Sequence, residues 1–128
     1  MNITLLYYER DSGECDACYN GEVLLGNKAI GGFKGFCINQ YELGGLLGCR
    51  VASLDDLEIE AAEKGYGTSA LKALTSYARK EYCNKFVITG LLSDELVSVF
   101  KRIGEKIGLV SEQLFTHEYF NKCLSWKL

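Results

Sequence analysis

The sequence contains no proline, and only one tryptophan, one methionine and one histidine. Without proline, tight turns have to be built by glycine, asparagine, aspartate or serine, and glycine occurs 14 times. No apolar run approaches the roughly 18 residues of a membrane-spanning helix, so no membrane partner is expected. The opening residues lack the basic start and long apolar stretch of a signal peptide. These absences predict a cytoplasmic protein.

An excess of basic residues is also missing. The 14 Lys and Arg residues face 17 Asp and Glu residues, which gives a formal net charge of -3. A general affinity for the nucleic-acid backbone is therefore disfavoured, and no nucleic-acid partner is expected. With 48% hydrophobic and 24% charged residues in a chain of 128, the composition is that of one folded domain over residues 1–128.

The six cysteines offer one close pair, Cys15-Asp-Ala-Cys18. The others are Cys37, Cys49, Cys83 and Cys123. Without an export signal, free thiols in a reducing compartment are expected. A structural zinc site would need a second close pair, and Cys37 and Cys49 are twelve residues apart. We therefore expect small buried thiols and no metal, with a cysteine-ligated zinc domain or a redox pair as the alternatives.

Hydrophobic periodicity predicts mainly strands in the first half of the chain. Residues 3–9 are rich in β-branched and aromatic side chains, as strands are. Residues 10–28 fit either a short helix or a long loop. Glycine-punctuated apolar segments over 29–53 predict two antiparallel strands joined near Gln40. Residues 55–60 alternate acidic and apolar side chains, the period of a strand.

The second half alternates helices and strands. Apolar residues recur at three- and four-residue steps over 68–82, which predicts an amphipathic helix. The apolar run 86–89 predicts a buried strand. Ser93 is a suitable N-cap for a second helix that Gly108 would end, and 109–128 contains two further strands. The fold class expected is α/β, with a mixed and mostly antiparallel sheet, because two strands joined through a helix should be parallel.

The segment between residues 60 and 71, EAAEKGYGTSAL, links a strand to the first helix through a glycine-flanked turn. Gly65 and Gly67 let the main chain approach a ligand closely, and the N–H groups of a first helical turn favour an anion. Lys64 adds a positive charge. This pattern predicts a phosphate or pyrophosphate site, with a tight turn containing packing glycines as the alternative. The Walker motif is missing, and a dinucleotide site is disfavoured because five residues separate Ile59 from Gly65.

The string KGYGT at 64–68, followed by ALKALTSYA, resembles the acyl-CoA motif R/Q-x-x-G-x-G/A of the GNAT superfamily of N-acetyltransferases. Downstream, LVSVFKRIGEKIGLV is similar to the later helix of that family. The resemblance covers about Val51 to Val110. It implies a GNAT-like fold, with a parallel pair of strands around the acyl-CoA site.

The resemblance also implies acetyl-CoA as co-substrate, no metal, and an amine as acceptor. The acceptor would be a protein lysine, a protein N-terminus or a small amine. The coenzyme-binding residues implied are Leu57, Ile59, Glu63, Lys64, Gly65, Tyr66, Gly67 and Thr68. Among them, the turn residues would hold the pyrophosphate through main-chain N–H groups, and the strand residues would bond the pantetheine arm. The domain is short for the family, which leaves substrate recognition minimal or shared with a partner such as a second subunit of a homodimer.

The resemblance and the acidic strand together give the catalytic candidates. Glu58 and Glu60 would lie beside the acyl site as general bases, with Asp56 on the same face, and burial or mutual repulsion would raise the pKa of one of them. The alternative is an exposed acidic face that attracts a cationic substrate.

Two positions depart from the family pattern. Ala62 replaces the first Arg or Gln of the motif, and the late-helix tyrosine that protonates the thiolate falls on Phe100 or Gly104. The remaining candidates for that proton donor are Tyr119, His117 and Ser98, without a ranking. These departures keep open a second interpretation, a non-catalytic GNAT-fold binding or regulatory module.

Overall fold

The computed structural model describes residues 2–60 and 64–128, which form eight strands and three helices. Their order along the chain is β1 (Ile3–Arg10), β2 (Ala17–Leu25), β3 (Lys28–Ile38), α1 (Tyr41–Leu47), β4 (Val51–Leu54), β5 (Asp56–Ile59), α2 (Tyr66–Lys80), β6 (Lys85–Leu91), α3 (Asp94–Lys106), β7 (Ser111–His117) and β8 (Asn121–Lys127). Within these described residues, no helix is both long and apolar enough to cross a membrane.

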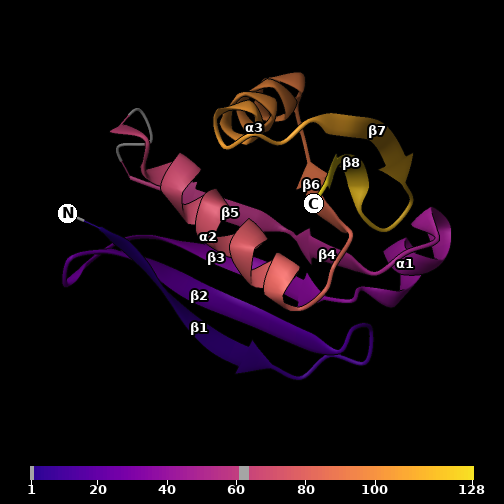
Figure 1. The fold of residues 1–128 in the computed structure, drawn as a ribbon, viewed down its shortest axis with the longest axis horizontal. Helices are drawn as coiled ribbons and strands as arrows, with labels where there is room; N and C mark the ends of the chain where they lie inside the picture. Colours follow the sequence, from indigo (N-terminus) through magenta and orange to yellow (C-terminus); the bar gives the residue numbers. More distant parts are fainter. Residues whose placement is uncertain (1, 61–63) are drawn as a thin grey trace.

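All eight strands belong to one sheet, in the order β1-β2-β3-β4-β6-β8-β7, with β5 paired to β3 beside this path (Figure 1). Every pairing is antiparallel except that of β4 with β6. These two strands are parallel, with Val51 opposite Lys85 at one end and Leu54 opposite Ile88 at the other. The helix α2 connects these two parallel strands. The predicted mixed α/β sheet with one parallel pair is therefore confirmed.

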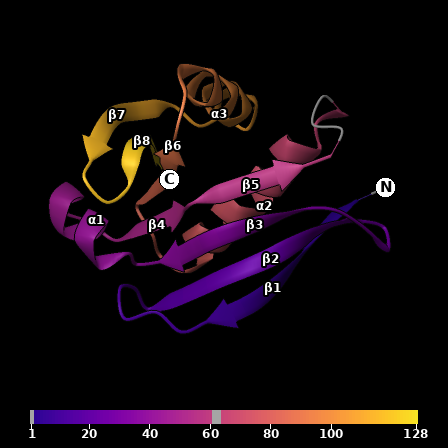
Figure 2. The same ribbon diagram turned by 180° about the vertical axis from the view of Figure 1, so that it is seen from behind.

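The two faces of the sheet are covered unequally. Helices α2 and α3 pack on one face, where Leu71, Leu74 and Phe100 join the main core with Phe86 and Trp126. The short helix α1 packs at one end of the opposite face, where Leu43 contacts a smaller cluster that includes Val51, Val87 and Cys123. Figure 2 shows β2, β3 and β5 in front of α2, with no described helix over them. We call this uncovered side of β2, β3 and β5 the open face.

Most predicted elements are confirmed. The strand over 3–9, the helix over 68–82 and the strand over 86–89 appear with ends shifted by at most two residues. Ser93 caps α3 as predicted, since its hydroxyl accepts a hydrogen bond from the N–H of Leu96 at 3.2 Å. Gly108 follows α3 with a positive φ of 82°, the conformation expected at a helix end.

Two expectations were wrong. Residues 17–25 form the strand β2 rather than a helix or loop, and Gly21 is needed there because a Cβ would lie 2.1 Å from the carbonyl oxygen of Leu6. The two strands between 29 and 53 are joined by the helix α1, not by a turn near Gln40. Gln40 instead caps this helix, since its side-chain oxygen accepts a hydrogen bond from the N–H of Leu43 at 2.8 Å.

Candidate active site

The two parallel strands of the sheet separate after four paired residues. Beyond Leu54 and Ile88, β5 follows β3 while β6 continues beside β8. At the point of separation, the hydroxyl of Thr89 donates to the Asp55 carboxylate at 2.6 Å and contacts the carbonyl of Leu54 at 3.2 Å. We call the space between β5 and β6, which opens at Asp55 and Thr89, the fork.

The edge of β5 that borders the fork has unpaired peptide groups. The N–H of Glu60 donates to Ile30 of β3 at 2.8 Å. Because peptide groups of successive strand residues point to opposite sides, those of Glu58 also face β3, and those of Leu57 and Ile59 face the fork. No described strand pairs with this side of β5. The side chains of Leu57 and Ile59 pack against the core, as the alternation predicts.

The helix α2 begins beside this edge with an uncapped first turn. Gly65 is its N-cap, with a φ of 81°, and the first turn contains no side-chain cap from the described residues and no acidic residue. By contrast, α3 has a serine cap followed by Asp94 and Glu95. Free N–H groups and the helix dipole make the start of α2 suitable for an anion.

A hollow of about 330 Å³ lies against this uncapped turn. It is lined by Gly65, Gly67, Thr68, Val99, Arg102, Ile103 and Lys106. The two cationic side chains come from α3, so main-chain N–H groups and positive charges converge from two helices. Lys64 lies next to the turn and is exposed. Glu63 and Ala62 lie outside the described residues.

A second hollow, of about 500 Å³, occupies the fork. It is lined by Asp55, Asp56, Glu58, Gly90, Leu92, Leu96, Tyr119, Phe120 and Asn121. The turn that joins β7 to β8 is held there because the N–H of Gly90 donates to the carbonyl of Phe120 at 2.7 Å. Leu96 lines this hollow, and Val99 lines the hollow at the start of α2. Because these two residues are three positions apart on α3, both hollows lie along one side of that helix.

A cavity of about 180 Å³ opens on the opposite side of the fork, on the open face. It is lined by Arg10, Asp11, Ser12, Glu14, Cys18, Gly35, Cys37, Gln40, Ser53, Asp55, Thr89 and Phe120. Asp55 and Phe120 line both this cavity and the hollow in the fork. The two spaces therefore meet at the Asp55–Thr89 hydrogen bond, where a group bound in the fork would face a group bound in the cavity.

The acidic residues singled out from the sequence differ in position. Asp56, Glu58 and Glu60 are all exposed, so the burial expected for one of them is not found. Glu58 lines both the fork and a separate hollow along β3, whereas Glu60 lines only that separate hollow. Sequence reasoning included Asp55 in the predicted strand 55–60 but not among the catalytic candidates, because these were the acidic residues on one face of that strand; in the structure Asp55 precedes β5. The signal was the consecutive pair Asp55 and Asp56, which breaks the alternation between β4 and β5.

The candidates for the proton donor also occupy different parts of the structure. Phe100 is buried, and a Cβ on Gly104 would lie 2.8 Å from the Trp126 ring, so neither position accommodates an inward tyrosine. Tyr119 lines the fork and is 70% exposed.

The other two candidates lie elsewhere. Ser98 lines a hollow along α3 together with Asp94, Glu95, Val99 and Arg102. The Nε2 atom of His117 lies 3.4 Å from a Glu42 carboxylate oxygen, and its Nδ1 accepts from the N–H of Tyr119 at 3.2 Å. His117 is therefore engaged beside the fork, and neither residue is among those that line it.

Comparison with known proteins identifies this arrangement at the level of fold. No protein-family model and no curated protein matches the sequence. Among solved structures, a GNAT family acetyltransferase from Elizabethkingia anophelis with acetyl-CoA bound aligns with a TM-score of 0.59 at 13% identity, over 99% of this chain and 97% of that one. Naa50 of Arabidopsis thaliana, in complex with the bisubstrate analogue CoA-Ac-MVNAL, aligns with a TM-score of 0.54 at 14% identity, over 85% and 71%.

A Vibrio cholerae protein assigned as a ribosomal-protein-serine acetyltransferase aligns with a TM-score of 0.57 at 18% identity and 87% coverage of this chain. The chain spans only 63% of that protein's length. Identities this low establish similarity of fold. The chain therefore has the fold of the GNAT acetyltransferases, as the motif at 64–68 predicted.

Proposed function

We propose that this protein is an N-acetyltransferase that moves an acetyl group from acetyl-CoA to a primary amine. The observation that carries the proposal is the unpaired edge of β5, which leads directly to the uncapped first turn of α2. The first feature offers peptide groups to an extended amide-containing ligand, and the second offers N–H groups to its phosphates. Acetyl-CoA has both parts in that order.

In this proposal the pantetheine arm bonds to the peptide groups of Leu57 and Ile59. The pyrophosphate rests on the main-chain N–H groups around the turn, at Lys64, Gly65, Tyr66, Gly67 and Thr68. Arg102 and Lys106, which line the adjoining hollow, neutralise the phosphates, including the 3'-phosphate of the adenosine. The exposed apolar side chains of Leu92 and Leu96 flank the arm within the fork.

The acetyl group would then lie near Asp55, and the amine would reach it through the cavity on the open face. A base removes a proton from the ammonium, the nitrogen attacks the thioester carbonyl, and the C–S bond breaks to leave a thiolate. Asp55 is the best-placed base because it lines both spaces. Glu58 lines only the fork side and Glu60 neither space, so the roles first assigned to them are secondary proposals. Tyr119 is the best-placed proton donor to the thiolate.

The cavity favours a cationic acceptor. Its carboxylates are those of Asp11, Glu14 and Asp55, and its one basic side chain is that of Arg10 among the described lining residues. A protonated amine is attracted to such a site before it is deprotonated for attack. Protein lysines, protein N-termini and small amines all fit this requirement.

Calorimetry with CoA tests the coenzyme site directly. The double variant R102A/K106A should weaken binding at least tenfold, because two phosphate contacts are lost. The matched control is R79A/K80A, which removes the same charge from the other end of α2 and should bind CoA like the wild type. Absence of CoA binding by the wild type, or equal weakening by both variants, would contradict the proposal.

Mass spectrometry of an amine panel incubated with acetyl-CoA then tests transfer. The second candidate function, a non-catalytic binding module, is favoured by the buried Phe100 and by the Gly104–Trp126 contact, which exclude the late-helix tyrosine. CoA binding without acetylation of any lysine peptide, N-terminal peptide or small amine would support the module over the enzyme.

A further inference from the structure

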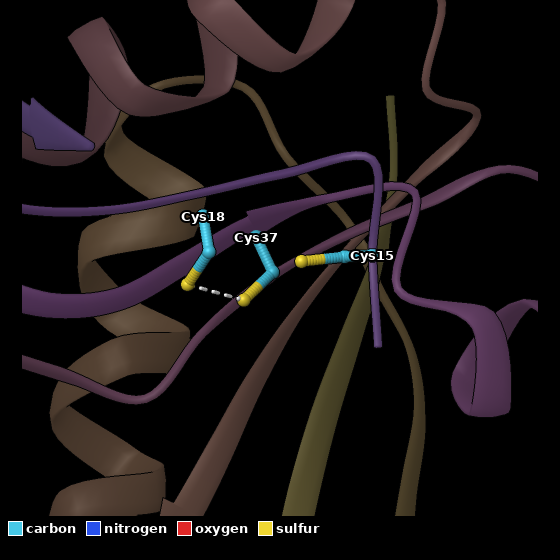
Figure 3. A group of neighbouring side chains, drawn as sticks. All are labelled: Cys15, Cys18 and Cys37. Carbon is cyan, nitrogen blue, oxygen red and sulfur yellow. Dashed lines mark hydrogen bonds between the residues drawn. The ribbon is translucent and has the colours of Figure 1, made fainter. Parts of the chain in front are cut away.

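Three cysteine side chains converge at the open face. Cys15 precedes β2, Cys18 lies in β2, and Cys37 is the direct cross-strand partner of Cys18 in β3. Their three sulfur atoms all lie within 4.8 Å of one another, and the Cys18 and Cys37 sulfurs are 3.0 Å apart. Figure 3 shows the Cys15 side chain pointing toward the sulfur of Cys37. We call these residues the thiol cluster.

The spacing of cysteines along the sequence indicated only the Cys15 and Cys18 pair of this cluster. A second close pair was required for a zinc site, and none exists. The pairing of β2 with β3 instead supplies the third thiol, since it places Cys37 opposite the second cysteine of the CxxC pair.

The geometry suits one tetrahedral metal ion. Zinc–thiolate bonds of about 2.3 Å place the sulfurs of a tetrahedral site about 3.8 Å apart, below the 4.8 Å limit that contains all three sulfurs. The Cys18 and Cys37 sulfurs, at 3.0 Å, would have to separate by about 0.8 Å to bind the same ion. Thiolate sulfur is a soft ligand that selects Zn²⁺ or Cu⁺ over Mg²⁺ or Ca²⁺. Cys15 and Cys18 are each only 5% exposed, so the ion would be held largely away from water.

The convergence of the three sulfur atoms, rather than their titration, favours a metal site. Burial is the main cause that raises the pKa of Cys15 and Cys37, and the neighbouring thiols raise the pKa of Cys37 further. A bound metal ion therefore has to displace the thiol protons. The same raised pKa values disfavour the thiolate that attacks during disulfide exchange.

We propose that Cys15, Cys18 and Cys37 bind one Zn²⁺ ion through three thiolates and leave its fourth position open to the cavity. Binding releases the protons of the three thiols to solvent and involves no redox change. Within the described chain, no other His, Cys, Asp or Glu has its ligand atom close enough to complete the group. Cys18 and Cys37 line the cavity, so water or a bound ligand supplies the fourth bond. Such an ion would fix the segment before β2 against β3.

Elemental analysis of the protein after equilibration with Zn²⁺ and gel filtration tests the stoichiometry. We expect one zinc per chain, and competition with a chromophoric chelator should show at least tenfold weaker binding in C15S, C18S and C37S. The matched control is C49S, because Cys49 is a free cysteine outside the cluster and should leave the affinity unchanged. Retention of full affinity in C37S, or no zinc in the wild type, would overturn the proposal.

Two further measurements apply if a serine variant fails to fold. Cobalt substitution of the wild-type protein should produce the charge-transfer absorption of thiolate ligands and the visible bands of a tetrahedral ion. Cobalt bound without thiolate bands would refute the site. Thiol titration of the unfolded, metal-free protein should count all six cysteines. A count of four would instead indicate one disulfide, and peptide mapping that places it between Cys18 and Cys37, the pair 3.0 Å apart, would overturn the proposal.

Discussion

Among the described residues, Asp55 is the one acidic residue that lines both the hollow in the fork and the cavity on the open face. Its hydrogen bond from Thr89 fixes the carboxylate at the opening of the fork. Asp55→Asn keeps an oxygen to accept that bond but removes the base. We expect kcat/KM for acetyl transfer to fall about 100-fold, with CoA affinity unchanged by calorimetry.

Glu105→Gln is the matched control, since it removes the same charge from an exposed residue on α3 that lines neither space. It should change kcat/KM by about twofold or less, within the range of surface effects. An Asp55→Asn enzyme as active as the wild type would eliminate Asp55 as the base, and a large loss in Glu58→Gln would transfer that role to Glu58.

The sequence predicted the turn and the helix start of the candidate site, but not the residues that strand pairing adds to it. The motif at 64–68 placed the turn and helix start correctly, because glycine conformation and free N–H groups are local properties of the chain. Asp55 and the third cysteine of the thiol cluster were missed for the opposite reason. Their positions depend on which strands pair, and strand pairing joins residues that are far apart in sequence.

Gly104 is a packing residue whose role is visible only in the structure. A Cβ added there would lie 2.8 to 3.0 Å from three atoms of the buried Trp126 ring. Gly104→Ala should therefore lower the free energy of unfolding by about 1–3 kcal/mol, the usual range for overpacking.

Urea denaturation followed by tryptophan fluorescence measures this loss. Gly45→Ala is the control, because Gly45 is also helical but has nothing within 4 Å of its Cβ position. That substitution should leave stability equal or raise it by about 0.5–1 kcal/mol, since alanine is the better helix former. Equal losses of stability in both variants would show that the contact with Trp126 is not the cause.

At the scale of elements, periodicity predicted both long helices but neither β2 nor α1. In β2, Asn20 and Gly21 interrupt the alternation of apolar residues, and the close approach of Leu6 is what requires glycine. The helix α1 spans only seven residues, two of them glycine, so its propensity is low. Its stability comes from the Gln40 cap and from burial of Leu43, which are both tertiary effects.

Asp16 joins three elements through its carboxylate. It accepts hydrogen bonds from Tyr41 at 2.7 Å, Arg50 at 3.0 Å and Asn39 at 3.1 Å, which connects the segment before β2 to α1 and the start of β4. The bond from Tyr41 is the largest cause that lowers the pKa of Asp16, followed by those from Asn39 and Arg50. The ionised form is therefore favoured in the folded state.

This lowered pKa has a consequence for stability in acid. The stabilisation is fully present above the ordinary aspartate pKa of about 3.9 and is lost as pH falls toward the lower folded value. Asp16→Asn should therefore be less stable than the wild type at neutral pH, and the difference should shrink below about pH 4. Urea midpoints across this range measure it, with Asp56→Asn as the exposed control; a gap that persists unchanged in acid would show that charge plays no part.

At the scale of the whole molecule, charge differs between the hollow at the start of α2 and the cavity on the open face. Arg102 and Lys106 line the hollow at the start of α2, where phosphates are proposed to bind. The cavity on the open face instead carries Asp11 and Glu14 in addition to Asp55. A net charge of only -3 conceals this difference, which under the proposed function would attract an anionic coenzyme to one place and a cationic acceptor to the other.

This difference predicts a salt-dependent KM for the acceptor. At saturating acetyl-CoA, raising ionic strength from about 50 mM to about 500 mM shortens the screening length from over 10 Å to a few ångströms. The KM of a lysine peptide should then rise about threefold with kcat unchanged, because attraction to the cavity is screened before the chemical step. Glu14→Gln should flatten this dependence, whereas Glu105→Gln, which removes the same charge from α3 outside the cavity lining, should preserve it. A KM that is independent of salt in the wild type would mean that the cavity carboxylates do not attract the acceptor, and would turn the search toward neutral amines.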